Sequence, residues 1–182
     1  MTGFTGLTKE ICKDAYFRIV RYAVVGAAEE HITNKLAGCM IVLNPSIPYE
    51  PKYKNAIEDG SFSDLVLWEN PFGNTSEHDI DKYIAIAYAK AFTSYLTGLP
   101  SHQVQQVMPS LYVPGMTKWG GSAIAGTGPM RLITAFSGVQ WNFDQMISEM
   151  MISAIQALCH EQMREIMASD EAMIQRPASI AT

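Results

Sequence analysis

The residues best suited to chemistry gather in one segment beyond the middle of the chain. His102 directly follows a helix-ending Leu-Pro-Ser sequence and is expected in a loop, with one helical turn over 102–108 as the alternative. A neutral imidazole can ligate a metal ion or act as a general base, whereas a solvated loop histidine is the alternative. Tyr112 and Lys118 are further acid–base candidates in the same segment. These three residues form the predicted catalytic set.

Aromatic and glycine residues near this set suit the binding of a flat ligand. A tyrosine or methionine can ligate haem iron, and a tryptophan can form the wall of a flat site. Glycine permits a positive φ or a close approach of the backbone to a ligand. Aromatic packing in the core or at a subunit interface is the alternative. The predicted ligand-binding residues, which include a second aromatic wall, are Trp68, Phe72, Met116, Trp119, Gly120 and Gly121.

The sequence carries no pattern of a preformed metal centre or of a phosphate loop. The four histidines show neither HxxxH nor HxH spacing, and the three cysteines form no CxxC pair. No metal site is therefore predicted, and the cysteines are expected to be buried free thiols. The glycines after Trp119 lack the Gly-Lys-Ser/Thr ending of a P-loop.

Composition narrows the class of protein. The 182 residues are 48% hydrophobic and only 17% charged, so we expect one domain with apolar surface left for a ligand or for other subunits. A net charge of −5 without a Lys/Arg cluster argues against nucleic acid as a partner. No apolar run approaches the roughly 20 residues that cross a bilayer, and no basic amphipathic face indicates membrane binding. Without a signal-peptide pattern, a reduced cytoplasmic compartment is expected.

Periodicity and turn residues predict the elements that must position these side chains. The best-defined helix, 76–101, has a capping box at Ser76 and Asp79 and ends at Gly98 and Pro100. A loop is expected at 70–74 and a flexible tail at 169–182, after a single domain at 1–168. The other expected elements are helices at 8–33 and 143–168, and strands at 35–43, 61–69, 111–113, 122–125 and 130–137.

The order of these elements predicts the fold class. Strands in hairpin-like pairs, with one long crossover, favour an α+β fold with a single, mostly antiparallel sheet and packed helices. Thr8 and Asn142 are the expected N-caps of the first and last helices. Lys90 is expected to extend along the surface or to pair with a carboxylate, and Asp144 to stabilise a helix start.

Three patterns within residues 61–158 are similar to those of a known family. They are Ala87-x-x-Lys90-Ala91-x-Thr93-x4-Gly98-x-Pro100-Ser101, Pro114-Gly115 with Gly120-Gly121-x-x-Ile124, and Phe136-Ser137-Gly138-x5-Asp144. In order and spacing they resemble the GlcG/HbpS family of haem-binding-like proteins, which is related to the C-terminal domain of cobalamin adenosyltransferases. The resemblance implies a profilin-like or longin-like sheet, dimers or larger rings, and binding of haem or another small molecule.

Three functional hypotheses follow. The first is a homo-oligomeric protein of the GlcG/HbpS type that binds haem or another flat small molecule. The second is a cofactor-free enzyme, an isomerase, lyase or oxidoreductase, that acts on a small organic or aromatic substrate in a catabolic pathway. It is motivated by the aromatic residues between Tyr112 and Trp119, which exceed the family norm. The third is an accessory subunit of a catabolic enzyme, suggested by the low surface charge.

Overall fold

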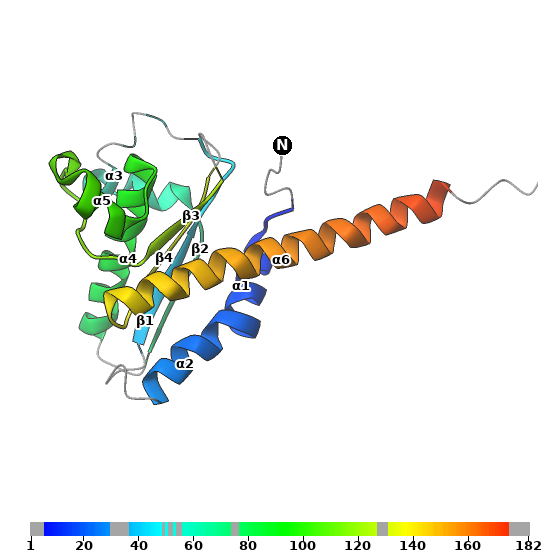
Figure 1. Cartoon of the computed structure of the whole chain (residues 1–182), viewed down its shortest axis with the longest axis horizontal. Coiled ribbons are helices and arrows are strands. Elements are labelled where there is room, and N and C mark those ends of the chain that lie inside the picture. The colour runs from blue at the N-terminus through cyan, green and yellow to red at the C-terminus, as the bar shows by residue number, and fades with distance from the viewer. Residues whose placement is uncertain are drawn as a thin grey trace, which may run out of the picture.

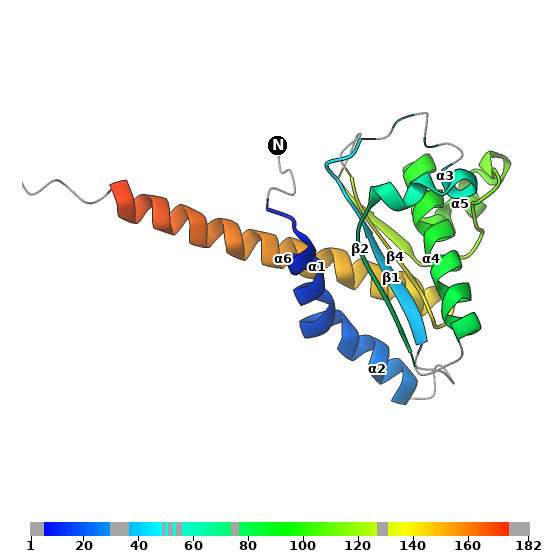
Figure 2. The same ribbon diagram turned by 180° about the vertical axis from the view of Figure 1, so that it is seen from behind.

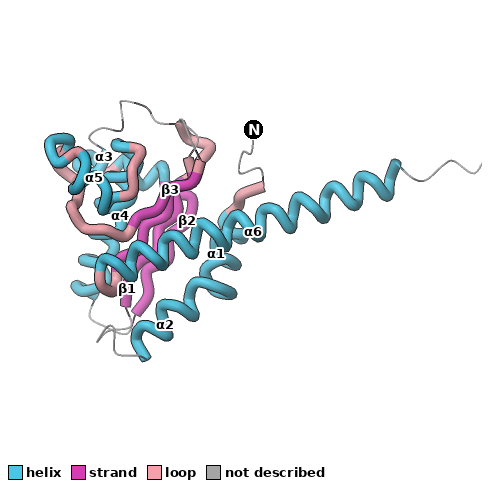
Figure 3. The backbone as a smooth tube through the Cα atoms, in the orientation of Figure 1, coloured by secondary structure: helices cyan, strands magenta, loops and turns pink. Residues whose placement is uncertain are grey.

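The computed structural model describes residues 6–29, 37–48, 50, 53, 56–73, 77–126 and 131–174. Its strands are β1 (Ala37–Leu43), β2 (Val66–Gly73), β3 (Ser122–Ala125) and β4 (Leu132–Ser137). They form one antiparallel sheet in the order β2-β1-β4-β3, as Figure 3 shows in magenta. With helices packed on both faces, the predicted α+β class with an antiparallel sheet is confirmed.

The two central strands are buried along their whole length. All seven residues of β1 and all six of β4 are buried because helices cover both faces. Side chains of β1 alternate between the faces: Cys39 and Ile41 join one core cluster, whereas Met40 and Val42 join the other. The continuous apolar sequence of these strands is therefore the sequence of a sheet interior.

Helix α4 (Glu77–Thr97) covers one face of the sheet, as Figure 1 shows. The small side chains of Ala87 and Ala91 are completely buried and allow a close approach to the strands. The helix ends at Gly98, whose φ of 72° is left-handed, so the predicted C-terminus is confirmed. The predicted cap at Ser76 lies outside the described residues.

The opposite face is covered by the two ends of the chain, as Figure 2 shows from behind. The predicted cap at Thr8 is confirmed, because its Oγ1 accepts a hydrogen bond from the Ile11 amide at 3.2 Å. The last helix begins at Trp141, so Asn142 lies inside its first turn rather than at the cap. The helices of this face are α1 (Lys9–Ala15), the π-helical turn η1 (Tyr16–Val20), α2 (Arg21–Glu29) and α6 (Trp141–Ile174).

Several expected boundaries are wrong, each for a physical reason. Residues 61–65 form a 3₁₀ helix, η3, and β2 then runs through 70–73, where a loop was expected. Pro71 is tolerated there because β2 is an edge strand that needs hydrogen bonds on one side only. Residues 109–111 form a 3₁₀ helix, η4, instead of starting a strand. His102 lies in helix α5 (Ser101–Val107), so the helical turn and not the loop is the alternative found.

Helix α6 continues to Ile174, beyond the expected end at residue 168. Its second half extends past the sheet and is largely exposed (Figure 1). None of the helices in the described ranges is long and apolar enough to cross a membrane.

Candidate functional site

Two neighbouring cavities lie where α5, the segment before β3 and the start of α6 meet. Their volumes are about 330 and 410 Å³, and both are lined by Trp119 and Trp141; we call them together the tryptophan groove. The two indoles are 54% and 49% exposed, an unusual exposure for such large apolar side chains. The first cavity is also lined by His102, Gln106, Lys118 and Gly120, and the lining of the second includes Lys90 and Asp144.

Hydrogen bonds across three elements hold α5, and hence His102, in place. The Ser101 amide donates to the Ser122 Oγ of β3 at 2.9 Å. That hydroxyl is also 2.7 Å from the hydroxyl of Ser94 in α4. All three serines are completely buried, so this contact fixes the start of α5 on the rigid sheet.

The tautomer of His102 follows from its neighbours. Gln145 Oε1 accepts from the Gly121 amide at 3.2 Å, and Gln145 Nε2 donates to Glu149 Oε1 at 2.8 Å, which fixes the orientation of the glutamine amide. His102 Nδ1 lies 3.1 Å from the same Oε1 and must therefore donate to it. The neutral ring then carries its lone pair on Nε2, as in histidines that ligate metals or accept protons.

Gly120 is needed for the close contacts of the groove. A Cβ built at this position would lie 2.7 Å from Trp141 Cε3 and 3.1 Å from His102 Cβ. A side chain here would therefore push the indole and the imidazole apart. These close contacts are with the protein's own side chains, and the predicted close approach of this backbone to a ligand stays a prediction.

A buried ion pair lies against the second cavity. Lys90 Nζ is 2.6 Å from Asp144 Oδ2 and donates to the Phe136 carbonyl at 2.8 Å. Asp144 Oδ1 accepts from the Val139 amide at 2.9 Å, so the carboxylate also holds the turn before α6. Burial lowers the pKa of Lys90 and raises that of Asp144, and the attraction between the two charges opposes both shifts. Of the two expected roles of Lys90, pairing with a carboxylate is the one found.

The structure brings together four of the predicted site residues. His102, Lys118, Trp119 and Gly120 line the first cavity, and Lys118 Nζ lies 5.7 Å from the centre of the Trp119 ring, a cation–π contact. Gly121, with a φ of +127°, lies directly behind them and donates to Gln145.

Four other predicted residues lie outside the groove. Trp68 and Phe72 are on the face of the sheet that the N-terminal helices cover, where both rings pack on Tyr16 at centroid distances of 5.5 and 6.0 Å. Met116 packs against the α4-side core. The Tyr112 hydroxyl is buried without a hydrogen-bond partner among the described residues, and burial raises its pKa.

The residues missed from the sequence include Gln106 and Trp141, which line the groove, and Gln145, which holds His102. Their spacing carries a signal, because Gln106 lies four residues after His102 and Gln145 four after Trp141, and such pairs share one face of a helix. Nothing in the sequence indicates that the two helices meet. Within the described parts of the chain, no group of three or more His, Cys, Asp or Glu side chains could hold a metal ion.

Comparison with known proteins gives structural relatives only. No protein-family model and no curated protein sequence matches the chain. Klebsiella pneumoniae ORFY, of the family DUF336, is 14% identical with a TM-score of 0.53, covering 83% of this chain and 91% of that one. HbpS is 17% identical (TM-score 0.52, 84% and 92% covered), and PduOC in its complex with haem is 13% identical (0.51, 81% and 94%). At these identities the likeness shows the fold alone.

Proposed function

We propose that this chain, which has the fold of the GlcG/HbpS-type proteins, binds a flat organic molecule in the tryptophan groove. The observation that carries the proposal is the hydrogen bond from His102 Nδ1 to Gln145, which leaves Nε2 as the free acceptor of a histidine that lines the groove. The half-exposed faces of Trp119 and Trp141 suit stacking on a flat ring. Lys118 supplies a positive charge for an acidic substituent.

Haem is the leading candidate ligand because the donor set suits it. His102 would ligate the iron through Nε2, with Gln145 fixing the ring as a hydrogen-bond acceptor behind it. Trp119, Trp141 and Lys118 would hold the porphyrin and its carboxylates. A bound haem would supply iron-centred redox chemistry. The haem complex of PduOC, a protein of the same fold, adds support by analogy only.

Enzymatic proton transfer is the second candidate function. The same tautomer makes His102 Nε2 a proton acceptor beside the indole of Trp119 or Trp141. Lys118 then serves as the cation that stabilises negative charge developing on a small aromatic or organic substrate. This function needs no cofactor and makes His102 the general base.

The test is a titration of the purified protein with haemin, followed by visible spectroscopy. We expect a saturable Soret shift with a Kd near micromolar, about −8 kcal/mol. His102→Ala should weaken binding at least tenfold, whereas His160→Ala, on the exposed surface of α6, should not. Tyr112→Phe tests the alternative iron ligand. A titration that does not saturate would exclude haem and direct attention to turnover of small aromatic substrates.

We also propose that the protein is a homo-oligomer, a dimer or a larger ring, and that it acts in the cytoplasm. Ile166 and Met167 are exposed apolar side chains on the half of α6 that extends past the sheet (Figure 1). Such side chains are typical of a subunit contact. Light scattering after size exclusion measures the mass, and a monomer at all concentrations would contradict the proposal.

A further inference from the structure

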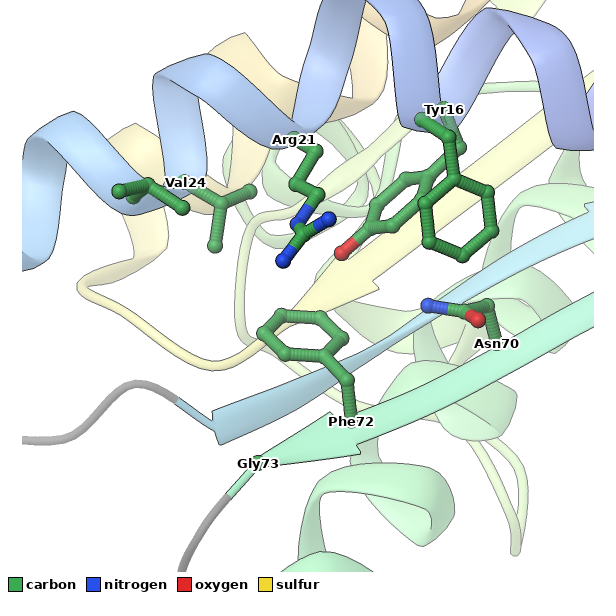
Figure 4. A pocket seen from close by; sticks show the side chains of 8 residues that line it. Tyr16, Arg21, Val24, Asn70, Phe72 and Gly73 are labelled. Carbon is green, nitrogen blue, oxygen red and sulfur yellow. The ribbon is translucent and has the colours of Figure 1, made fainter.

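A further cavity lies between the N-terminal helices and the edge strand β2. It has a volume of about 320 Å³, and we call it the edge pocket (Figure 4). This size is at the lower end for small-molecule sites. Its lining is mainly apolar, with three polar side chains; the residues are Tyr16, Phe17, Arg21, Val24, Val25, Asn70, Phe72 and Gly73.

The π-helical turn η1 brings two of the polar side chains together. In a regular α-helix, residues five apart point in directions about 140° apart. Here the Arg21 amide donates to the Tyr16 carbonyl, closing the wider i to i+5 turn. Figure 4 shows the Arg21 guanidinium reaching toward the Tyr16 hydroxyl, above the ring of Phe72. Such π-turns are frequent at functional sites because they place side chains that a regular helix would separate.

The three polar groups are arranged to receive negative charge. Asn70 and Tyr16 both line the pocket, and burial raises the pKa of Tyr16, so the phenol stays protonated and can donate. Arg21 lies 5.9 Å from the centre of the Phe17 ring and, among the described residues, has no carboxylate within ion-pair distance. A guanidinium beside a phenolic donor suits a carboxylate, which Arg binds with two parallel hydrogen bonds.

The remaining walls are suited to an apolar body. Val24 and Val25 contribute one side and Phe72 the other, and the Phe72 ring is stacked on Phe136 behind it at 6.1 Å. A fully hydrophilic anion such as phosphate would leave this apolar surface without a partner. An anion with a ring or a short alkyl chain covers it.

We propose that the edge pocket binds a small organic carboxylate with an apolar body, the size of a monocyclic aromatic acid. Arg21 and the Tyr16 hydroxyl hold the carboxylate, and Phe72, Val24 and Val25 contact the body. This site is separate from the tryptophan groove, because the two share no lining residue. The groove and its histidine play no part in it.

Calorimetric titration of the full chain with benzoate, phenylacetate and octanoate tests the proposal. At least one of these acids should bind with a Kd below about 1 mM. Benzamide, which matches benzoate in shape but lacks its charge, should bind at least tenfold more weakly. Arg21→Gln should weaken binding at least tenfold, and the matched control is Arg18→Gln, which removes an exposed arginine paired with Asp14 on the same helical segment.

A second variant blocks the pocket without touching the charge. Val25→Trp should abolish carboxylate binding while the far-ultraviolet circular dichroism stays native. His102→Ala should leave carboxylate binding unchanged, so failure of the groove proposal and failure of this one are distinguishable. The proposal is overturned if no acid binds to the folded wild-type chain, if benzamide binds as well as benzoate, or if Arg21→Gln binds like Arg18→Gln.

Discussion

The polar groups of the tryptophan groove and of the edge pocket are arranged in opposite ways. In the groove the polar side chains bind one another: His102 donates to Gln145, and Lys90 pairs with Asp144. In the edge pocket the charged group, Arg21, has no ionic partner among the described residues and reaches over the cavity. The groove is thus preorganised by hydrogen bonds within the protein, whereas the edge pocket keeps a charge for its ligand.

This difference predicts which substitutions lower the free energy of unfolding and which weaken only ligand binding. Groups that satisfy one another inside the protein leave a buried partner behind when one is removed. When a group that faces a cavity is removed, only the affinity of the ligand site falls. Stability measurements should therefore separate the two regions more sharply than binding measurements do.

The largest expected effect is the loss of one partner of the buried ion pair. Lys90→Met leaves Asp144 as an uncompensated buried carboxylate and should lower the free energy of unfolding by about 3–5 kcal/mol. The edge-pocket counterpart, Arg21→Gln, is on an exposed residue and should cost less than about 0.5 kcal/mol. Urea denaturation measures both.

The double variant Lys90→Met/Asp144→Asn sharpens this prediction. Asparagine keeps an oxygen for the Val139 amide and carries no charge, so the double variant should be more stable than Lys90→Met alone. If the costs of the two single substitutions simply add, the pair is not coupled and the contrast between the regions fails.

A pair of glycine substitutions gives the next largest contrast. Gly120→Ala places a Cβ against Trp141 and His102 and should cost about 1–3 kcal/mol, while weakening any ligand of the groove. Gly26→Ala, in α2 beside the edge pocket, meets no atom within 4 Å and should raise stability by about 0.5–1 kcal/mol. Thermal and urea unfolding check both signs, and destabilisation by Gly26→Ala would contradict the structure of α2.

The sequence predicts the parts of this fold that depend on local signals. The end of α4 follows from Gly98 and Pro100, and β1 from a continuous apolar run. The extension of β2 through residues 70–73 could not be predicted from the sequence. Whether Pro71 can lie in a strand depends on which strand forms the edge of the sheet. That order is a property of the whole chain.

The candidate site shows the same limit. His102, Lys118 and Trp119, which line one cavity, were predicted from residue types that suit chemistry. Gln145 was missed because it is 43 residues from His102 and becomes its partner only when α6 packs beside α5. Trp68 was assigned to a ligand wall although the sequence does not show on which face of the sheet its side chain lies. In the structure it pairs with Val42, and because paired residues share one side of a sheet, both belong to the same core cluster.

The smallest expected effect is a difference in pH dependence that belongs to the edge pocket. Burial raises the pKa of Tyr16 above its ordinary value near 10. The folded chain therefore keeps this phenol protonated at pH values where the unfolded chain loses the proton. The contribution of Tyr16 to stability is complete below pH 10 and is lost as the pH rises above it, by about 1.4 kcal/mol per unit while only the unfolded state ionises.

Tyr16→Phe isolates this contribution from other buried groups. The Cys12 thiol, whose pKa burial raises to about 12, also destabilises the fold at alkaline pH in wild type and variant alike. The difference in unfolding free energy between the two chains should thus be constant from pH 7 to 9 and should shrink by about 1 kcal/mol between pH 10 and 11. A constant difference up to pH 11 would mean that the Tyr16 hydroxyl ionises as freely in the folded chain as in water, and that the edge pocket is open to solvent around it.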